Sequence, residues 1–434
     1  MPSLSRTTHK LASLSRCDWG HGWRTAIGRV TVTVAARLTA VFVPTVAAGM
    51  VAVMGSWPAP AHAEPYRPSD DTQVLERLPA RPTDPVQREL RALRQAVAAD
   101  RQAAEPALAL AQRLFDLALE TGDPRHVGRA EATLLPWRAS RDPEMLLLRA
   151  QLAQYRHGFD ESLQLFAQAL EADPSNTRAL SWRAAVLMVM ARYDAVRPDC
   201  RRIRELGEAL LATGCEAYLD ATLGRARPAY EALRQALDNH PEARSSLRQW
   251  TLAVLAEIAR RLGRAADADR HFRQALELSP RDQYLLNAYA EFLLFEQRWD
   301  DAVKLLSPWQ SSDGLLLLLA RAERARGEHG RAQADAQRMR ARFADGGLRG
   351  DALNAQDEAW FRLVFEEDAP RALALALANW AIQKEPRDAE IVLAAARAAG
   401  QPQAASPVLD WMSRTGIEDP RLAALAAPIR KDMR

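Results

Sequence analysis

The stretch LGRAADADRHFRQALELSP, residues 262–280, decides the fold. Good helix formers fill it between Gly263 near its start and Pro280 at its end. Glycine permits a tight turn, and proline cannot continue a helix. A further run of helix formers, residues 250–261, comes directly before it. We therefore interpret the stretch as the turn and the second helix of an antiparallel helix hairpin.

The hairpin recurs with a period of 34 residues. The frame that spans residues 249–282 also fits 143–176, and a third copy begins at Gln283. Small residues at positions 8 and 20 let the two helices approach closely, a bulky residue at 24 fills the gap toward the next hairpin, and proline at 32 ends the second helix. The matching residues are Ala256, Ala150 and Ala290 at position 8; Ala268, Ser162 and Ala302 at 20; Phe272, Phe166 and Leu306 at 24; Ala275 and Ala169 at 27; and Pro280 and Pro174 at 32.

These residues resemble the tetratricopeptide repeat in both spacing and residue type. The third copy departs from the pattern at position 27, where Trp309 stands. The resemblance implies an all-α fold, a right-handed superhelical solenoid of antiparallel helix hairpins whose stacked neighbours bury the apolar faces. Weaker copies are expected at residues 107–142, with an insertion around 121–125, and at 177–209, 210–243 and 313–345.

Composition agrees with this fold and argues against a nucleic-acid partner. Hydrophobic residues make up 48% of the chain but aromatic residues only 6%, so Ala and Leu, which favour helices, supply most of the apolar content. Residues 1–63 carry 6 Lys and Arg against 1 acid, which leaves 52 basic and 54 acidic residues in the rest. A nearly neutral chain with interspersed charges does not have the basic patch that nucleic-acid binding requires.

The first 63 residues have the pattern of a secretory signal peptide. A basic segment precedes an apolar run, residues 38–57, and Ala61-His62-Ala63 has the small residues of a cleavage site. We predict cleavage after Ala63. The alternative is an uncleaved anchor, because the run approaches the roughly 20 residues that span a bilayer.

These patterns predict both the location of the protein and a division of the chain into four regions. The expected location is the periplasm or the outside of the cell, with membrane contact only through the signal segment if it stays uncleaved. We expect a signal peptide at residues 1–63, a Pro-rich extended arm at 64–85, a tetratricopeptide-like array at 86–343, and a C-terminal helical region with degenerate repeats at 344–434, which opens with a glycine-containing interruption at 344–350.

Two cysteines follow the signal segment, Cys200 and Cys215. The repeat frame puts one on the second helix of a hairpin and the other on the first helix of the next, with Gly207 near the midpoint of the turn. Antiparallel helices that turn there bring both cysteines to the same height, so in an oxidising compartment we predict a disulfide. Two separate buried thiols are the alternative.

No motif for catalysis, cofactor binding or metal binding is present. The five histidines after residue 63 have no i+3 or i+4 partner and no neighbouring cysteines, so we expect no metal site. His271, beside Phe272, is expected at a surface or partly buried position. We expect no cofactor and no enzymatic activity. The alternative is an envelope enzyme that cleaves peptidoglycan or another glycan and uses the superhelix as a substrate cradle.

The resemblance implies that a partner protein or peptide binds in the concave groove. In the family, positions 2, 5, 9, 12 and 13 of the first helix face this groove, and aromatic residues and arginines there make good binding anchors. We therefore predict a non-catalytic scaffold of the cell envelope and, more narrowly, an accessory to the assembly of an envelope complex. The predicted groove residues are Gln151, Tyr155, Trp250, Glu257, Arg260, Arg261, Tyr284, Asn287, Glu291, Phe295, Arg321 and Arg324.

Overall fold

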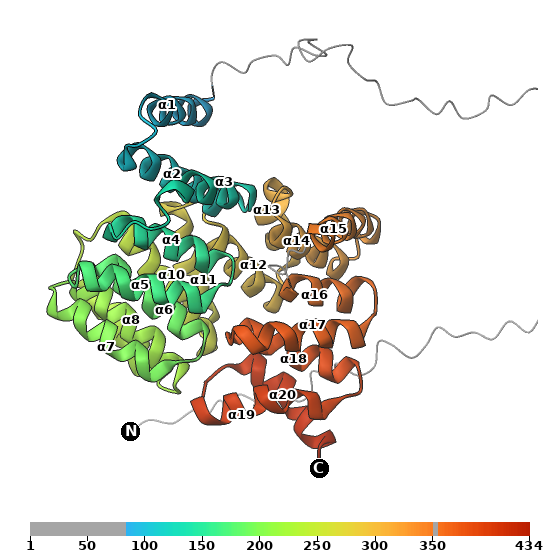
Figure 1. Cartoon of the computed structure of the whole chain (residues 1–434). Coiled ribbons are helices and arrows are strands. Elements are labelled where there is room, and N and C mark those ends of the chain that lie inside the picture. The colour runs from blue at the N-terminus through green and yellow to red at the C-terminus, as the bar shows by residue number, and fades with distance from the viewer. Residues whose placement is uncertain (1–83, 350–354) are drawn as a thin grey trace, which may run out of the picture. The chain divides into compact units, whose positions relative to one another are not determined.

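The computed structural model describes residues 84–349 and 355–434, and within these ranges it contains helices and no strand. The predicted signal peptide, its cleavage site after Ala63 and residues 64–83 of the arm lie outside the described residues. Most helices pack in consecutive antiparallel pairs, as Figure 1 shows. The pairs are α2 (Ala104–Thr121) with α3 (Arg125–Leu134), α4 (Pro143–Tyr155) with α5 (Phe159–Ala172), α6 (Thr177–Val189) with α7 (Tyr193–Glu205), α8 (Ala209–Thr222) with α9 (Ala226–Asp238), α10 (Ser245–Arg261) with α11 (Ala265–Leu278), α12 (Gln283–Phe295) with α13 (Trp299–Leu306), α14 (Asp313–Ala325) with α15 (His329–Arg349), and α16 (Ala355–Phe365) with α17 (Ala369–Ile382).

Four more helices flank these pairs. One precedes them, α1 (Pro85–Ala99), and three follow: α18 (Pro386–Ala398), α19 (Ser406–Thr415) and α20 (Pro420–Asp432). Helix α18 packs mainly on α17 and α20. No helix in the described ranges is long and apolar enough to cross a membrane.

The predicted repeat frame is confirmed in the two clear copies. Helices α4 and α5 fall within 143–176. Helix α11 falls within 249–282, and α10 ends within that copy but begins before it, at Ser245. The small residues are fully buried where the paired helices cross, and the Ser162 hydroxyl donates to the Ala150 carbonyl oxygen at 2.8 Å. Phe166 and Phe272 have no exposed surface, because they fill the space between neighbouring hairpins. The all-α fold built from helix hairpins is therefore confirmed.

In the copies that begin at residues 143, 177, 210, 249, 283 and 313, the turn inside the hairpin has a residue with positive φ at position 15. Gly224, Gly263 and Gly327 occupy it in three copies, where glycine adopts the left-handed region without strain. In three other copies the same position holds a side chain: His157 at 59°, Ala191 at 56° and Gln297 at 58°. The turn geometry is therefore kept even where the sequence does not favour it.

Two segments differ from the expected pattern. In the third copy the second helix, α13, has only eight residues, and a short 3-10 helix, Ser307–Trp309, with Pro308 at its second residue, replaces its end. Trp309 at position 27 belongs to this shortened end. Helix α15 extends to Arg349, so the glycine-containing segment expected to interrupt the array is helical up to that residue.

The predicted disulfide is confirmed. Cys200 on α7 and Cys215 on α8 are bonded, with a Cα–Cα distance of 5.6 Å. The bridge joins two consecutive hairpins across a sequence separation of 15 residues. A loop of this length gives about 3 kcal/mol of stabilisation in the chain-entropy treatment.

The array curves toward its first helices. Each first helix from α2 to α16 contacts the first helix of the next pair, or α18 at the end, whereas successive second helices make no comparable contact within the described residues. We call the surface formed by the first helices of the pairs the inner face. Helix α12 also contacts α2, and Gln283 Nε2 donates to the Glu120 carbonyl oxygen at 3.1 Å. The array therefore returns to its own first hairpin.

Candidate functional site

Helices α16 to α20, which we call the C-terminal helices, lie against part of the inner face of the preceding pairs. Two of the contacts are made at hairpin turns: the Lys384 backbone N–H donates to the Val189 carbonyl oxygen at 2.7 Å, and Trp411 Nε1 donates to Tyr193 Oη at 2.8 Å. Arg260 on α10 forms a buried ion pair with Asp419 at 3.2 Å. The chain thus covers part of its own predicted groove.

Arg260 and Arg261 are buried and already have partners. Arg260 pairs with Glu257 at 2.9 Å as well as with Asp419. Arg261 is 2% exposed, donates to Thr222 Oγ1 at 3.2 Å and lies over the ring of Tyr218. Charge reversal at these two positions would place carboxylates beside buried carboxylates, so it would disturb folding as well as any partner contact.

Other predicted groove residues also pack within the chain. Arg321 lies 4.2 Å above the Trp360 ring, and Arg324 donates to the Val364 carbonyl oxygen. Trp250 stands directly over Gly214 of α8. The remaining members of this group are Gln151, which is buried, and Tyr155, Glu257, Asn287 and Glu291, which are partly buried.

Tyr284 and Phe295 are the exposed members of the predicted groove set, at 52% and 46%. They stand eleven residues apart on α12, which is three helical turns, so they share one face of the helix. The predicted binding role of the twelve residues stays a prediction, but these two aromatic residues are the ones with surface to offer a partner.

A polar cavity of about 230 Å³ lies between the array and the C-terminal helices. We call it the inner cavity. Helices α4 to α6 supply one part of its lining and α16 to α18 the other. It is lined by Gln154, His157, Phe159, Val189, Gln356, Asp357, Asn379, Gln383, Glu385 and Arg387. A smaller cavity of about 30 Å³ shares Glu385 and Arg387 and includes Tyr284 in its lining.

Burial raises the pKa of both carboxyl groups in the inner cavity. For Asp357 it raises the pKa to about 6, and the nearby Glu291 adds to the effect whereas Arg387 opposes it. For Glu385 it raises the pKa to about 7, with Asp388 adding to the effect. These carboxylates are therefore poorly compensated at neutral pH.

The neighbouring Asp388 is fully buried and well supplied with donors. Asn379 Nδ2 donates to it at 2.8 Å, Gln383 Nε2 at 2.9 Å, and the Glu385 backbone N–H at 2.9 Å. These bonds hold the two amide side chains in place. By contrast, Gln356 Nε2 and Arg387 Nε are buried without a hydrogen-bond partner.

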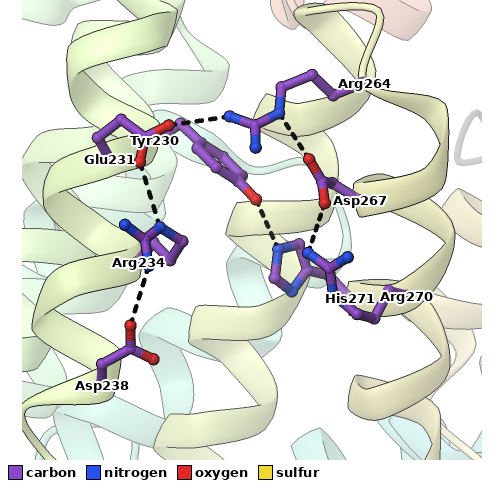
Figure 2. Close-up of polar contacts among 8 residues, drawn as sticks. All are labelled: Tyr230, Glu231, Arg234, Asp238, Arg264, Asp267, Arg270 and His271. Atoms are coloured by element: carbon purple, nitrogen blue, oxygen red, sulfur yellow. Dashed lines mark hydrogen bonds and ion pairs between the residues drawn. The ribbon is translucent and has the colours of Figure 1, made fainter.

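A second hollow, the outer groove, lies over α9, α10 and α11 and has a volume of about 400 Å³. Figure 2 shows the polar contacts that connect α9 with α11 beside it. Arg264 bridges Glu231 at 2.9 Å and Asp267 at 2.6 Å, and Arg270 pairs with the same Asp267. Because these charges satisfy one another, we interpret them as a brace between two consecutive hairpins.

His271 belongs to this brace and is more buried than expected. It is 6% exposed, and its Nε2 lies 2.9 Å from Tyr230 Oη (Figure 2). Burial lowers its pKa to about 4, so the ring is neutral at neutral pH. Within the described ranges no group of three or more His, Cys, Asp or Glu side chains is arranged to hold a metal ion.

The half of the inner cavity that the C-terminal helices supply was not predicted from the sequence. One feature could have indicated it. Asn379 and Gln383 stand four residues apart at the end of a helix whose other residues are mostly Ala and Leu. Amides at this spacing lie on one face of a helix, and in an otherwise apolar helix they mark a buried polar contact.

The described part of the chain has a tetratricopeptide-like fold of consecutive helix hairpins. No protein-family model and no curated protein matches the chain. Three solved structures are similar to it. One is from the Cut9–Hcn1 hetero-tetramer of the APC/C, with 14% identity, coverage of 80% of this chain and 81% of that chain, and a TM-score of 0.37. The second is the human IFIT1 dimer with m7Gppp-AAAA, with 14% identity, coverage of 78% and 87%, and a TM-score of 0.44. The third is PilW, a type IV pilus biogenesis factor, with 18% identity, coverage of 50% and 98%, and a TM-score of 0.30.

Proposed function

We propose that this protein is a non-catalytic scaffold of the cell envelope that binds a partner protein or peptide at its inner face. The observation that carries the proposal is the exposed aromatic pair on α12, Tyr284 and Phe295. Large exposed aromatic side chains are the residues that most often supply binding energy in protein interfaces. Between them on the same face stand Asn287 and Glu291, which add polar contacts.

The partner is tested by photo-crosslinking in intact cells. A benzoylphenylalanine side chain replaces Tyr284 or Phe295, and the crosslinked products are identified by mass spectrometry. A matched control replaces Leu278, which is 41% exposed on α11. We expect one partner from both inner-face positions and none from the control. The same product from all three positions, or no product from either inner-face position, contradicts the proposal.

The envelope location is tested by fractionation and by sequencing the amino terminus of the mature chain. We expect the protein in the periplasmic or secreted fraction, with Glu64 as its first residue. A cytoplasmic protein that begins at Met1 contradicts this part of the proposal.

The enzyme alternative depends on the C-terminal region. Helix pairing continues there through α16 and α17, which favours the scaffold. The two carboxyl groups of the inner cavity, Asp357 and Glu385, are the groups that a glycan-cleaving enzyme would use. We expect no release of soluble fragments from purified peptidoglycan. If the wild-type protein releases fragments and the Asp357→Asn variant does not, the enzyme hypothesis is favoured over the scaffold hypothesis.

A further inference from the structure

We propose that the inner cavity binds an α-ammonium group together with the carbonyl or carboxylate oxygen beside it. Free amino acids and the amino termini of peptides share this chemistry. The inference deepens the proposed function, because the amino terminus of a partner is one of these two sources.

Two buried donors at the inner cavity have no acceptor. Gln356 is 8% exposed, and its Nε2 has no hydrogen-bond partner. The Arg387 Nε atom is also without a partner, and the guanidinium reaches Glu291 only at 3.8 Å. Buried donors are almost always satisfied in native proteins. A ligand oxygen that accepts from either donor would supply a missing partner.

The two carboxyl groups of the inner cavity have no cation in contact within the described residues, although Glu385 accepts from the Asp388 backbone N–H in a capping box. Neither Asp357 nor Glu385 forms an ion pair within 4.0 Å among the described residues. Asn379 and Gln383 each donate one N–H to Asp388, which orients the two amides, and their carbonyl oxygens are acceptors for a ligand. A ligand that fits must therefore bring N–H donors as well as an oxygen.

The charge of the lining selects among ligands of this kind. The inner cavity has one cation, Arg387, and two acids, Asp357 and Glu385. Burial lowers the pKa of His157, so it does not supply the missing positive charge. An anion would meet two carboxylates, and a neutral polyol would leave them uncompensated. An ammonium group balances the charge, and the oxygen next to it reaches the donors of Gln356 and Arg387.

The size of the inner cavity limits the ligand to a small unit. Pockets for drug-sized molecules measure about 300–1,000 Å³. The inner cavity, at about 230 Å³, is smaller and suits one amino-acid residue. A peptide would therefore enter with its first residue alone.

The test is calorimetric titration of the purified protein with four probes. L-alanine and L-alanyl-L-alanine carry the α-ammonium group, and their N-acetyl derivatives lack it. We expect at least one of the first two to bind and its acetylated form to bind at least tenfold more weakly, which is about 1.4 kcal/mol. Binding of L-alanine identifies the free amino acid as a source, and binding of the dipeptide alone identifies the amino terminus. Binding of none of the probes, or equal binding of the acetylated forms, overturns the inference.

Variants connect the binding to this cavity. Asp357→Asn should weaken binding at least tenfold. Glu358→Gln, on the same helix but paired with Arg362, should change it less than twofold. Equal effects of the two variants overturn the inference. The crosslinks from Tyr284 and Phe295 report the partner separately, so failure of the amino-group site is distinguishable from failure of the scaffold.

Discussion

At the scale of single residues, Gly263 shows how backbone conformation constrains the repeat. Its φ is 68°, and a Cβ atom added there would contact nothing within 4 Å. The cost of a side chain at this position is therefore one of backbone strain and not of crowding.

We predict that Gly263→Ala lowers the free energy of unfolding by about 1–2 kcal/mol. The matched control is Gly128→Ala in α3, where an added Cβ also has open space but φ is not positive. There alanine should be neutral or raise stability by up to about 1 kcal/mol, because it favours helix. Urea denaturation of both variants measures the difference, and equal effects would contradict this account of the turn.

The buried carboxyl of Asp357 makes stability depend on pH in a defined direction. Burial raises its pKa to about 6, so between about pH 4 and pH 6 the folded state holds a proton that the unfolded state has released. The free energy of unfolding therefore falls as pH rises through this window. Arg387 and Arg321 lower the pKa of Asp357 and so make this pH dependence weaker, whereas Glu291 and Asp313 raise the pKa and make it stronger.

Asp357→Asn, which cannot ionise, should match the wild type near pH 4 and be more stable by up to about 3 kcal/mol at pH 8. Denaturant titrations at both pH values measure this. Glu358→Gln should not gain stability on the same pH change, because the carboxylate that it removes is paired with Arg362. A loss of stability in Asp357→Asn at pH 8 would contradict the assignment.

At the scale of helices, the close crossing of α8 and α10 depends on a glycine. A Cβ atom on Gly214 would lie 2.3 Å from Cζ3 of Trp250. Trp250 was predicted as a groove residue, and the structure places its ring over the neighbouring hairpin.

We predict that Gly214→Ala lowers stability by about 1–3 kcal/mol because it overpacks this crossing. In the Trp250→Ala background the clash is absent, so the same change should be neutral or stabilising through helix propensity. A double-mutant cycle measures the coupling. Additive effects would mean that the two residues do not meet.

The helix pairs could be predicted from the sequence because their determinants are local. Small residues at positions 8 and 20 and proline at 32 act within one hairpin or between neighbours, so Pro143–Tyr155 and Ala265–Leu278 fall within the predicted copies. The inner cavity could not be predicted in this way. It brings His157 and Val189 together with Asn379 and Gln383, and their juxtaposition depends on the accumulated curvature of many hairpins. Family positions likewise identify a groove but not the segment of the same chain that covers it.

At the scale of the whole molecule, Asp419 joins the C-terminal helices to the array. Its side chain is 1% exposed, accepts from the Arg421 backbone N–H at 2.9 Å and pairs with Arg260 of α10. Removing one partner of a buried ion pair is strongly destabilising.

We predict that Asp419→Asn lowers the free energy of unfolding by about 3 kcal/mol and speeds amide hydrogen exchange in α18 to α20. Asp142→Asn is the matched control, because Asp142 caps α4 at 2.9 Å but has no ion-pair partner within the described ranges. Asparagine replaces aspartate well as a helix cap, so the control should change little. Unchanged exchange in Asp419→Asn would show that this ion pair does not hold the C-terminal helices.

The contact between Gln283 and Glu120 has a consequence for how the array unfolds. In most helical-repeat proteins each repeat touches only its neighbours, so stability is close to a sum of local terms and the ends fray independently. Here residues more than 160 positions apart are hydrogen-bonded, and Tyr193 and Trp411 are separated by 218 positions. Such links couple distant hairpins, so the first and last hairpins should lose their structure in one cooperative transition. They also raise the mean sequence separation of contacts, which slows folding relative to an open array of the same length.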